Sequence, residues 1–401
     1  MRKKFSDIKN EDGAVVALFA ILISSFLIIA LFVIVFDVSA IYSERRVIQN
    51  AADTSVLATA QECAVGGTGA ILNINSAYAS GVCGTQSYAE QFAGKYANLN
   101  SPDSLSNISE ICGTAPLNQC GSLNSGLYEC KSVNSAYKNY VRVKTSTKQS
   151  SGNSIKSLFY SLISPNDSEV KVVGCAQSAW GKAAFAPVSF PMALPICDYS
   201  LNGTKLIKDF ESNNPVVTGG CTVTDLNGDV FNYASPTTGF DLLSNFGCPG
   251  ITAPKTVKIG DILQVESSLT QVAGGCPSGS SQFYYQISRF LNTKVFIPVV
   301  TSVACQSGSV NCQGNYQFQV ASFYSFKFIG GKFKNNSPIG SPPPCAAGDP
   351  CQNNSGLWPP ACDATRNCLY GTFERAIVPG ADVSLDPSFP AVGAMAVQLL
   401  P

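Results

Sequence analysis

The stretch Ala14–Phe36, AVVALFAILISSFLIIALFVIVF, decides how this chain is organised. It contains no charged residue and no proline. A helix rises about 1.5 Å per residue, so one of this length covers roughly 35 Å, enough to cross the hydrocarbon core of a bilayer. A buried helix of a soluble protein rarely stays apolar on every face over such a length. The stretch therefore predicts a transmembrane helix.

The composition indicates a β- and loop-rich body outside this helix. Only 13% of the residues are charged, and Lys plus Arg balance Asp plus Glu at 26 each. This balance provides no basic surface for nucleic acid, so we expect no nucleic-acid partner. The chain contains no histidine, which removes the commonest general base and the commonest metal ligand. We therefore expect no cofactor, no metal site and no small-molecule ligand.

All 16 cysteines follow the apolar stretch, and Cys63 is the first. A cytosolic protein seldom carries so many cysteines, and the absence of any Cys-x-x-Cys pair argues against zinc. The cysteines therefore predict disulfides and an oxidising compartment. Spacing alone does not fix their connectivity. The candidates that lie a few residues apart in the sequence are Cys112, Cys120, Cys305, Cys312, Cys345, Cys351, Cys362 and Cys368.

Positive charge predicts the orientation of the span. Four basic residues precede it between residues 2 and 9, whereas only Arg45 and Arg46 follow it closely. Positively charged flanks stay on the cytoplasmic side. We expect a cytoplasmic N-terminus and a large extracytoplasmic C-terminal part, which agrees with the placement of the cysteines.

The helix is expected to continue beyond the span to about Gly66. Apolar residues recur there at helical spacing, at Val38, Ile41, Ile48, Ala52 and Val56. This apolar stripe needs a cover. The cover is either the protein's own globular body or the helix of a partner.

The same helix carries a recognisable run of residues. It opens with Gly13-Ala14-Val15 and continues with Asp37, Tyr42, Arg45, Arg46, Gln49, Asn50, Ala51, Ala52 and Asp53. This run resembles the N-terminal segment of TadG-like proteins of the Flp (tight adherence) pilus-assembly system, over about the first 62 residues. The resemblance implies a pilin-like unit in the bacterial cytoplasmic membrane. The implied partners are that membrane and other pilus-assembly or pseudopilin proteins.

Two kinds of processing are alternatives to a retained helix. A signal peptidase would cut near Ala40, although the apolar region is longer than in an ordinary signal peptide. A prepilin-type peptidase would cut after Gly13, although Leu18 then stands where a pilin normally has Glu. The sequence leaves both cuts open.

The fold class predicted is α+β, with a pilin-like α+β unit followed by a β-rich, disulfide-bonded domain. We expect strands at Tyr140–Val143 and Glu169–Trp180 with a short helix at Ile155–Ile163 between them. Prolines at 187, 191 and 195 predict the boundary between the two domains. The expected parts are a cytoplasmic tail (1–13), a transmembrane helix (14–36), an extended helix (37–66), a pilin-like domain with a cysteine-rich insertion (67–186) and a β-rich C-terminal domain (187–401).

Two oxygen-rich motifs resemble metal sites but lack required ligands. Asp37 and Ser39 begin an Asp-x-Ser-x-Ser pattern that Ile41 breaks. Asp225–Asp229 has calcium-loop spacing without the glycine and distal carboxylate of an EF-hand, so a hairpin tip at Asn227-Gly228 is the better interpretation. No Gly-x-Ser-x-Gly elbow, Walker motif or dinucleotide-binding loop occurs in a usable context. We therefore expect a protein that is not an enzyme.

Two functions fit these observations. The first is a single-pass envelope protein that assembles or anchors a Flp-type pilus or secretion apparatus. The alternative is a membrane-tethered surface adhesin or ligand-binding ectodomain.

Overall fold

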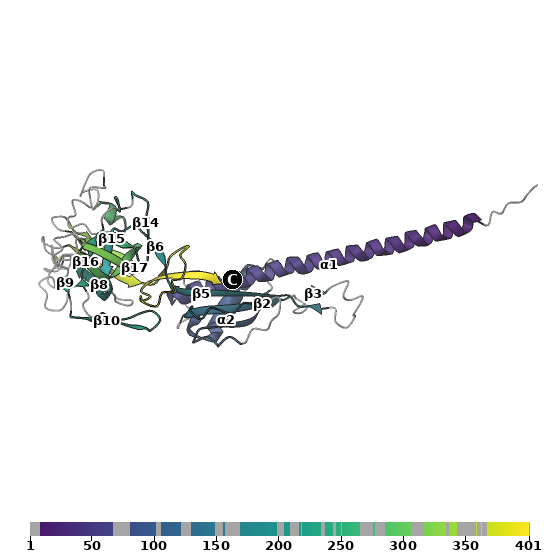
Figure 1. The fold of residues 1–401 in the computed structure, drawn as a ribbon, viewed down its shortest axis with the longest axis horizontal. Helices are drawn as coiled ribbons and strands as arrows, with labels where there is room; N and C mark the ends of the chain where they lie inside the picture. The colour runs from purple at the N-terminus through teal and green to yellow at the C-terminus, as the bar shows by residue number, and fades with distance from the viewer. Residues whose placement is uncertain are drawn as a thin grey trace, which may run out of the picture.

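The computed structural model of the chain describes residues 9–66, 81–101, 106–121, 130–148, 155–156, 169–198, 204–208, 216–217, 219–233, 237–243, 246–249, 251–264, 276, 285–305, 316–333, 337–342, 358, 362 and 367–400. A single helix extends from a body that is built mainly of β-strands (Figure 1).

The extended helix, α1, runs without interruption from Lys9 to Val65. Its apolar first half is exposed on every side, with Phe26 76% and Phe36 69% exposed. By length and composition it can cross a membrane. The second half enters the body, and the helix ends just before Gly66, whose φ of 62° gives the left-handed conformation common after a helix. The prediction of one long helix is confirmed.

The second half of α1 packs on a five-stranded sheet with the order β1-β2-β5-β21-β20. All neighbours are antiparallel except β20 and β21, which are parallel. A second helix, α2 (Gln86–Leu99), lies beside α1, and the Thr85 side chain caps its N-terminus. The strands are β1 (Ser106–Gly113), β2 (Asn139–Thr147), β5 (Val173–Lys182), β20 (Ala376–Ile377) and β21 (Ala394–Leu400).

This sheet and α2 cover the apolar stripe of α1. Ile48, Ala52 and Val56 have no exposed surface. Ala52 and Val56 pack in one cluster with residues of α2 and of strands β2 and β5. The protein's own body is therefore the cover of this stripe from Ile48 onward, and the alternative of a partner helix is wrong for that part, whereas Val38 is 60% exposed.

The first sheet combines distant parts of the chain. Its strand β21 comes from the C-terminal end and pairs with β5, a partner that the sequence did not reveal. The predicted strands near residues 140 and 175 fall in β2 and β5. The expected short helix begins instead as strand β3 (Ile155–Lys156), which pairs with β4 (Glu169–Val170). The rest of that expected helix lies outside the described residues.

The C-terminal body is built around a larger sheet of the order β13-β7-β16-β17-β19-β8. Its centre is the long hairpin of β16 and β17, and its core is aromatic, with Tyr324, Phe326, Phe328 and Phe373 buried. Its strands are β7 (Met192–Pro195), β8 (Thr204–Lys208), β13 (Asp241–Leu242), β16 (Lys294–Cys305), β17 (Tyr316–Lys332) and β19 (Cys368–Glu374), with β15 (Ile262–Gln264) and β18 (Ile339–Gly340) also paired to β17.

Short ribbons and turns complete the described fold. The ribbon that matters most below is β10 (Cys221–Thr224) with β11 (Val230–Tyr233). The other elements are β6 (Phe185–Val188) with β14 (Lys255–Lys258), β9 (Val216–Val217) with β12 (Thr237–Thr238), and the 3-10 turns η2 (Val82–Gly84) and η3 (Ile196–Asp198).

Six disulfides lie within the described residues, so the disulfide framework is confirmed. They join Cys63–Cys83, Cys112–Cys120, Cys130–Cys175, Cys197–Cys221, Cys248–Cys276 and Cys362–Cys368. The first ties α1 to η2, and each bridge contributes about 2–4 kcal/mol to folding. Among the expected candidates, Cys312, Cys345 and Cys351, and the side chain of Cys305, lie outside the described residues.

A glycine sets the distance between α1 and the sheet. A Cβ atom on Gly174 would lie 2.8 Å from the carbonyl oxygen of Ile48 and 3.0 Å from the nitrogen of Gln49. Backbone atoms of α1 and β5 cannot move aside as a flexible side chain would. We expect Gly174→Ala to lower the free energy of unfolding by about 1–3 kcal/mol, measured by urea denaturation of the full chain in detergent. Gly121→Ala, where a Cβ meets no atom within 4 Å, is the control. Equal stability of the two variants would contradict the close approach.

Candidate functional site

Between the exposed apolar half of α1 and its buried half lies a segment that we call the stalk, residues 37–47. At about 1.5 Å per residue it is roughly 17 Å long. Ile48 is the first fully buried residue after it. Because α1 is continuous through this segment, the body is joined to the membrane helix without a hinge.

The exposed face of the stalk is cationic and aromatic. The Arg46 guanidinium lies over the ring of Tyr42, 4.8 Å from its centroid, one helical turn away. The hydrogen bond and positive charge of Arg46 lower the pKa of the Tyr42 phenol. Arg45 is exposed beside them. The stalk therefore presents two arginines and a tyrosine to its surroundings.

Gln49 connects α1 to the backbone of β5. Its Nε2 donates to the carbonyl of Cys175 at 2.9 Å, and its Oε1 accepts from the Cys175 N–H at 3.3 Å. Strand β21 ends at Leu400, opposite Gln177 of β5. Alternate residues of a strand direct their backbone groups to the same side, so Cys175 is the next β5 residue whose N–H and C=O would bond to β21 if that strand continued. The Gln49 amide takes the place of a neighbouring strand at this point.

Asp53 holds Gln49 in this position. Its Oδ1 accepts a 2.8 Å hydrogen bond from Gln49 Nε2. Burial raises the pKa of the Asp53 carboxyl, and the hydrogen bond from Gln49 opposes that shift. One turn earlier, Thr145 of β2 donates from its hydroxyl to the Ile48 carbonyl at 2.8 Å. Side chains of α1 and β2, together with the backbone of β5, thus form a polar seam.

The residues that carry the resemblance divide into two groups. Gln49, Ala51, Ala52 and Asp53 lie in the seam, where the two alanines are fully buried. Tyr42, Arg45, Arg46 and Asn50 are exposed, while Asp37 is half-exposed at the membrane end of the stalk. Ile48 and Ala52 are buried in the body, so they cannot be the contact to a partner that their spacing suggested. The partners Thr145, Gly174 and Cys175 carried no local signal in the sequence.

The Asp225–Asp229 motif is the tip of the β10–β11 hairpin. Asp225 accepts from the N–H groups of Asn227 and Asp229 with Oδ1, and from the Ala391 N–H with Oδ2. Gly228 has φ 83°, as a tight turn requires. The carboxylate is thus used by backbone donors. No group of metal ligands occurs among the residues that the structure describes.

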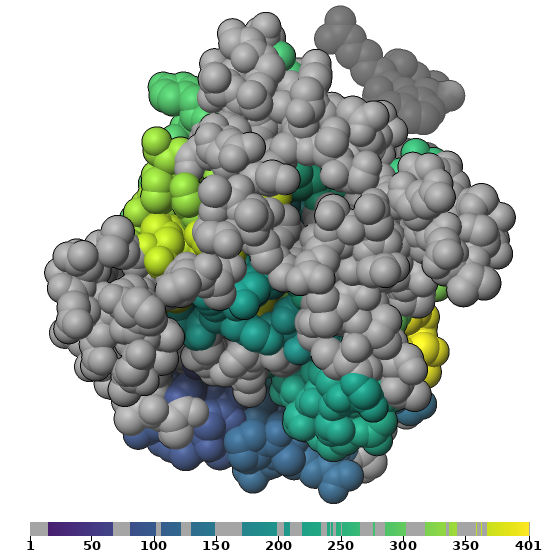
Figure 2. Space-filling view, turned by 90° about the vertical axis from the view of Figure 1, so that its left-hand side faces the viewer, coloured from purple at the N-terminus to yellow at the C-terminus, as the bar shows by residue number. Residues whose placement is uncertain are grey.

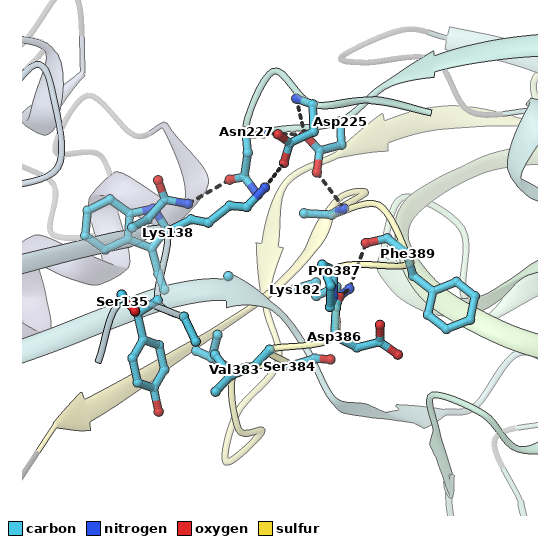
Figure 3. A pocket seen from close by; sticks show the side chains of 18 of the residues that line it. Ser135, Lys138, Lys182, Asp225, Asn227, Val383, Ser384, Asp386, Pro387 and Phe389 are labelled. Atoms are coloured by element: carbon cyan, nitrogen blue, oxygen red, sulfur yellow. Dashed lines mark hydrogen bonds and ion pairs between the residues drawn. The ribbon is translucent and has the colours of Figure 1, made fainter. Parts of the chain in front are cut away.

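A cavity of about 300 Å³ lies where this hairpin tip meets the first sheet (Figure 3). Lys138 pairs with Asp229, and Asn139 Nδ2 donates to Asn227 Oδ1 at 2.7 Å. The two contacts join β2 and the residue before it to the hairpin of the C-terminal body. Figure 2, in space-filling form, shows teal residues of the C-terminal body against blue residues of the N-terminal unit.

Lys182 of β5 lies at the cavity and is only 5% exposed. Its Nζ donates to the carbonyl oxygens of Asp386 and Phe389. Burial lowers the pKa of its ammonium group, and the charges of Asp386 and Asp225 oppose the shift. The polar groups around the cavity bind one another, so this arrangement joins two parts of the chain.

Replacing Gln49 tests the seam. Gln49→Leu would leave the N–H and C=O of Cys175 without their partner, so we expect a loss of about 1–3 kcal/mol in the free energy of unfolding. Asn50→Leu, an exposed neighbour on the same helix, should change stability by less than about 0.5 kcal/mol. The measurement is chemical denaturation of each full-length variant in detergent. Two variants of the same stability would show that Gln49 is not a structural link.

A comparison with known families matches one segment of the chain. Residues 13–62 match the model of the TadE/G-like family of Flp pilus assembly. A search of curated proteins and a search of solved structures find no match. The matched segment covers the apolar half of α1, the stalk and the residues that α1 contributes to the seam. The chain therefore carries a TadE/G-like domain of Flp pilus assembly over residues 13–62.

Proposed function

We propose that the protein is a non-enzymatic, single-pass component of a Flp-type pilus or secretion apparatus in the bacterial cytoplasmic membrane. The observation that carries this proposal is the continuity of α1 from its exposed apolar half into the core of the body. Because no hinge separates the two halves, the body keeps a fixed orientation to the membrane helix. A component of this kind provides position and direction to its partners.

The packing of α1 supports a pilin-like role for the first unit. A long helix whose outer half lies on a mainly antiparallel sheet is the arrangement that we propose as pilin-like. The parts are a tail (1–13), a span (14–36), an extended helix (37–66), this unit (67–186) and a β-rich domain (187–401). Strands β20 and β21 return from the last part to the sheet of the unit.

We propose that the stalk is the docking surface for other assembly subunits. It combines exposure with Tyr42, Arg45 and Arg46, and the seam residues around it are already used within the body. An acidic surface on a partner would complement the two arginines. A dedicated ligand-binding role has less support, because the polar groups lining the cavity bind one another.

Charge reversal tests the docking surface. We expect Arg45→Glu with Arg46→Glu to reduce co-purification of the other assembly subunits at least about tenfold, while the disulfide-bonded body stays folded. Lys208→Glu with Lys258→Glu makes the same charge change at exposed positions of the C-terminal body and serves as the control. The readout is quantitative mass spectrometry of the purified complex. Unchanged recovery of the subunits would remove the stalk as the interface.

The orientation is tested with epitope tags. The charge bias before the span and the disulfides after it both favour a cytoplasmic N-terminus. A C-terminal tag should bind antibody on intact spheroplasts, and an N-terminal tag should do so only after lysis. The opposite pattern, or a majority of free thiols in the native protein, would contradict this topology.

A further inference from the structure

Among the residues that the structure describes, the C-terminal strand β21 forms an open edge of the first sheet. Its neighbour β20 pairs with only Ala394 and Met395. Beyond Met395, no strand among the described residues pairs with β21 on that side. Burial changes at the same place: Met395 and Ala396 are buried, whereas Leu399 is 43% exposed.

Hydrogen bonds show which backbone groups point to this edge. The Gln398 carbonyl accepts from the side-chain hydroxyl of Ser178 on β5, and the Met395 carbonyl accepts from the N–H of Val378 on the other side. Backbone groups of successive strand residues point to opposite sides. The N–H and C=O groups of Val397 and Leu399 therefore point away from β5, toward the open edge.

The other free margins of this sheet are closed. On β1, a bulge interrupts the strand between Ile108 and Glu110. The outward groups of Ile111 and Gly113 are bonded to Gln86 and to the carbonyl of Asn118. Beside the end of β21, the backbone of Cys175 is already hydrogen-bonded to the Gln49 side chain. Bulges, charges and covering loops are the usual protection of strand edges. The sequence of β21, AMAVQLL, is uncharged, and within the described part of the chain no bulge interrupts its pairing with β5 and no strand pairs beyond Met395 on its other side.

A second copy of this chain does not fit the open edge. The start of β5 lies beside Gln49, and its end lies near Ala64, at the far end of α1. Strand β5 therefore runs away from the membrane. Strand β21 is antiparallel to β5 and runs back toward the membrane (Figure 1). Two β21 strands paired antiparallel would send their membrane helices in opposite directions. Pairing β21 of one copy with β1 of the next would keep the helices parallel, but the margin of β1 is closed.

We propose that β21 accepts one extended strand from a different subunit of the same apparatus, paired to Val397 and Leu399. This interaction rests on the proposed function, which supplies the partner, and adds a second contact to the stalk. Main-chain hydrogen bonds would supply affinity, as in other cases of strand addition. The exposed Leu399 side chain favours a partner strand with alternating apolar residues.

Proline substitution tests the backbone contact. Leu399→Pro removes an N–H that faces the open edge. It leaves the hydrogen bonds between β21 and β5 intact, because proline is tolerated in an edge strand where the N–H points away from the neighbouring strand. We expect co-purification of assembly subunits with full-length Leu399→Pro to fall about tenfold. Leu399→Thr keeps the N–H and should retain the subunits.

The outcomes separate this interaction from the stalk. Normal recovery with Leu399→Pro together with loss in the Arg45→Glu, Arg46→Glu variant would overturn the strand addition and leave the proposed function standing. Absence of every subunit from the wild-type preparation would overturn both. If Leu399→Pro exposes free thiols and so has not folded, amide hydrogen exchange of residues 394–400 in the wild-type complex decides: about tenfold slower exchange on complex formation supports the added strand, and unchanged exchange overturns it.

Discussion

The structure depends on the contact between the outer half of α1 and strand β5. Gly174 lets the backbones approach, because any Cβ there would collide with the Ile48 carbonyl. Buried Ala51 and Ala52 keep the helix side of the contact small, and Gln49 bonds directly to the β5 backbone. A helix held by its backbone and by a packed apolar stripe cannot rotate against the sheet without breaking both.

The rest of the molecule is attached to this contact from the far end of the chain. Strand β21 continues the sheet beside β5, and the hairpin tip at Asp225 receives the Ala391 N–H just before that strand begins. The ammonium group of buried Lys182 holds the loop before β21 by donating hydrogen bonds to the carbonyl oxygens of Asp386 and Phe389. The C-terminal body is thereby connected to the membrane helix through the same sheet that covers the helix.

Local patterns predicted the features that are local in the chain. The apolar run predicted α1, the cysteines predicted the disulfides, and Asn227-Gly228 predicted the hairpin. The sequence did not reveal what covers the stripe at Ile48, because the answer lies in strands more than 90 residues away, as the bond between Thr145 and Ile48 shows. The pairing of β21 was equally hidden, because a weak alternation of apolar residues does not name a partner. The resemblance singled out Gln49 and Asp53, and their packing inside the body was visible only once β5 was in place.

In this structure α1 is one continuous helix from the membrane-crossing half, through the stalk, into the core of the body. Amide hydrogen exchange across residues 37–47 in a lipid nanodisc tests this continuity most directly. A continuous helix predicts slow exchange throughout the stalk, comparable to that of the buried turns after Ile48. Exchange at the rate of an unstructured peptide within the stalk would show a hinge and contradict the account.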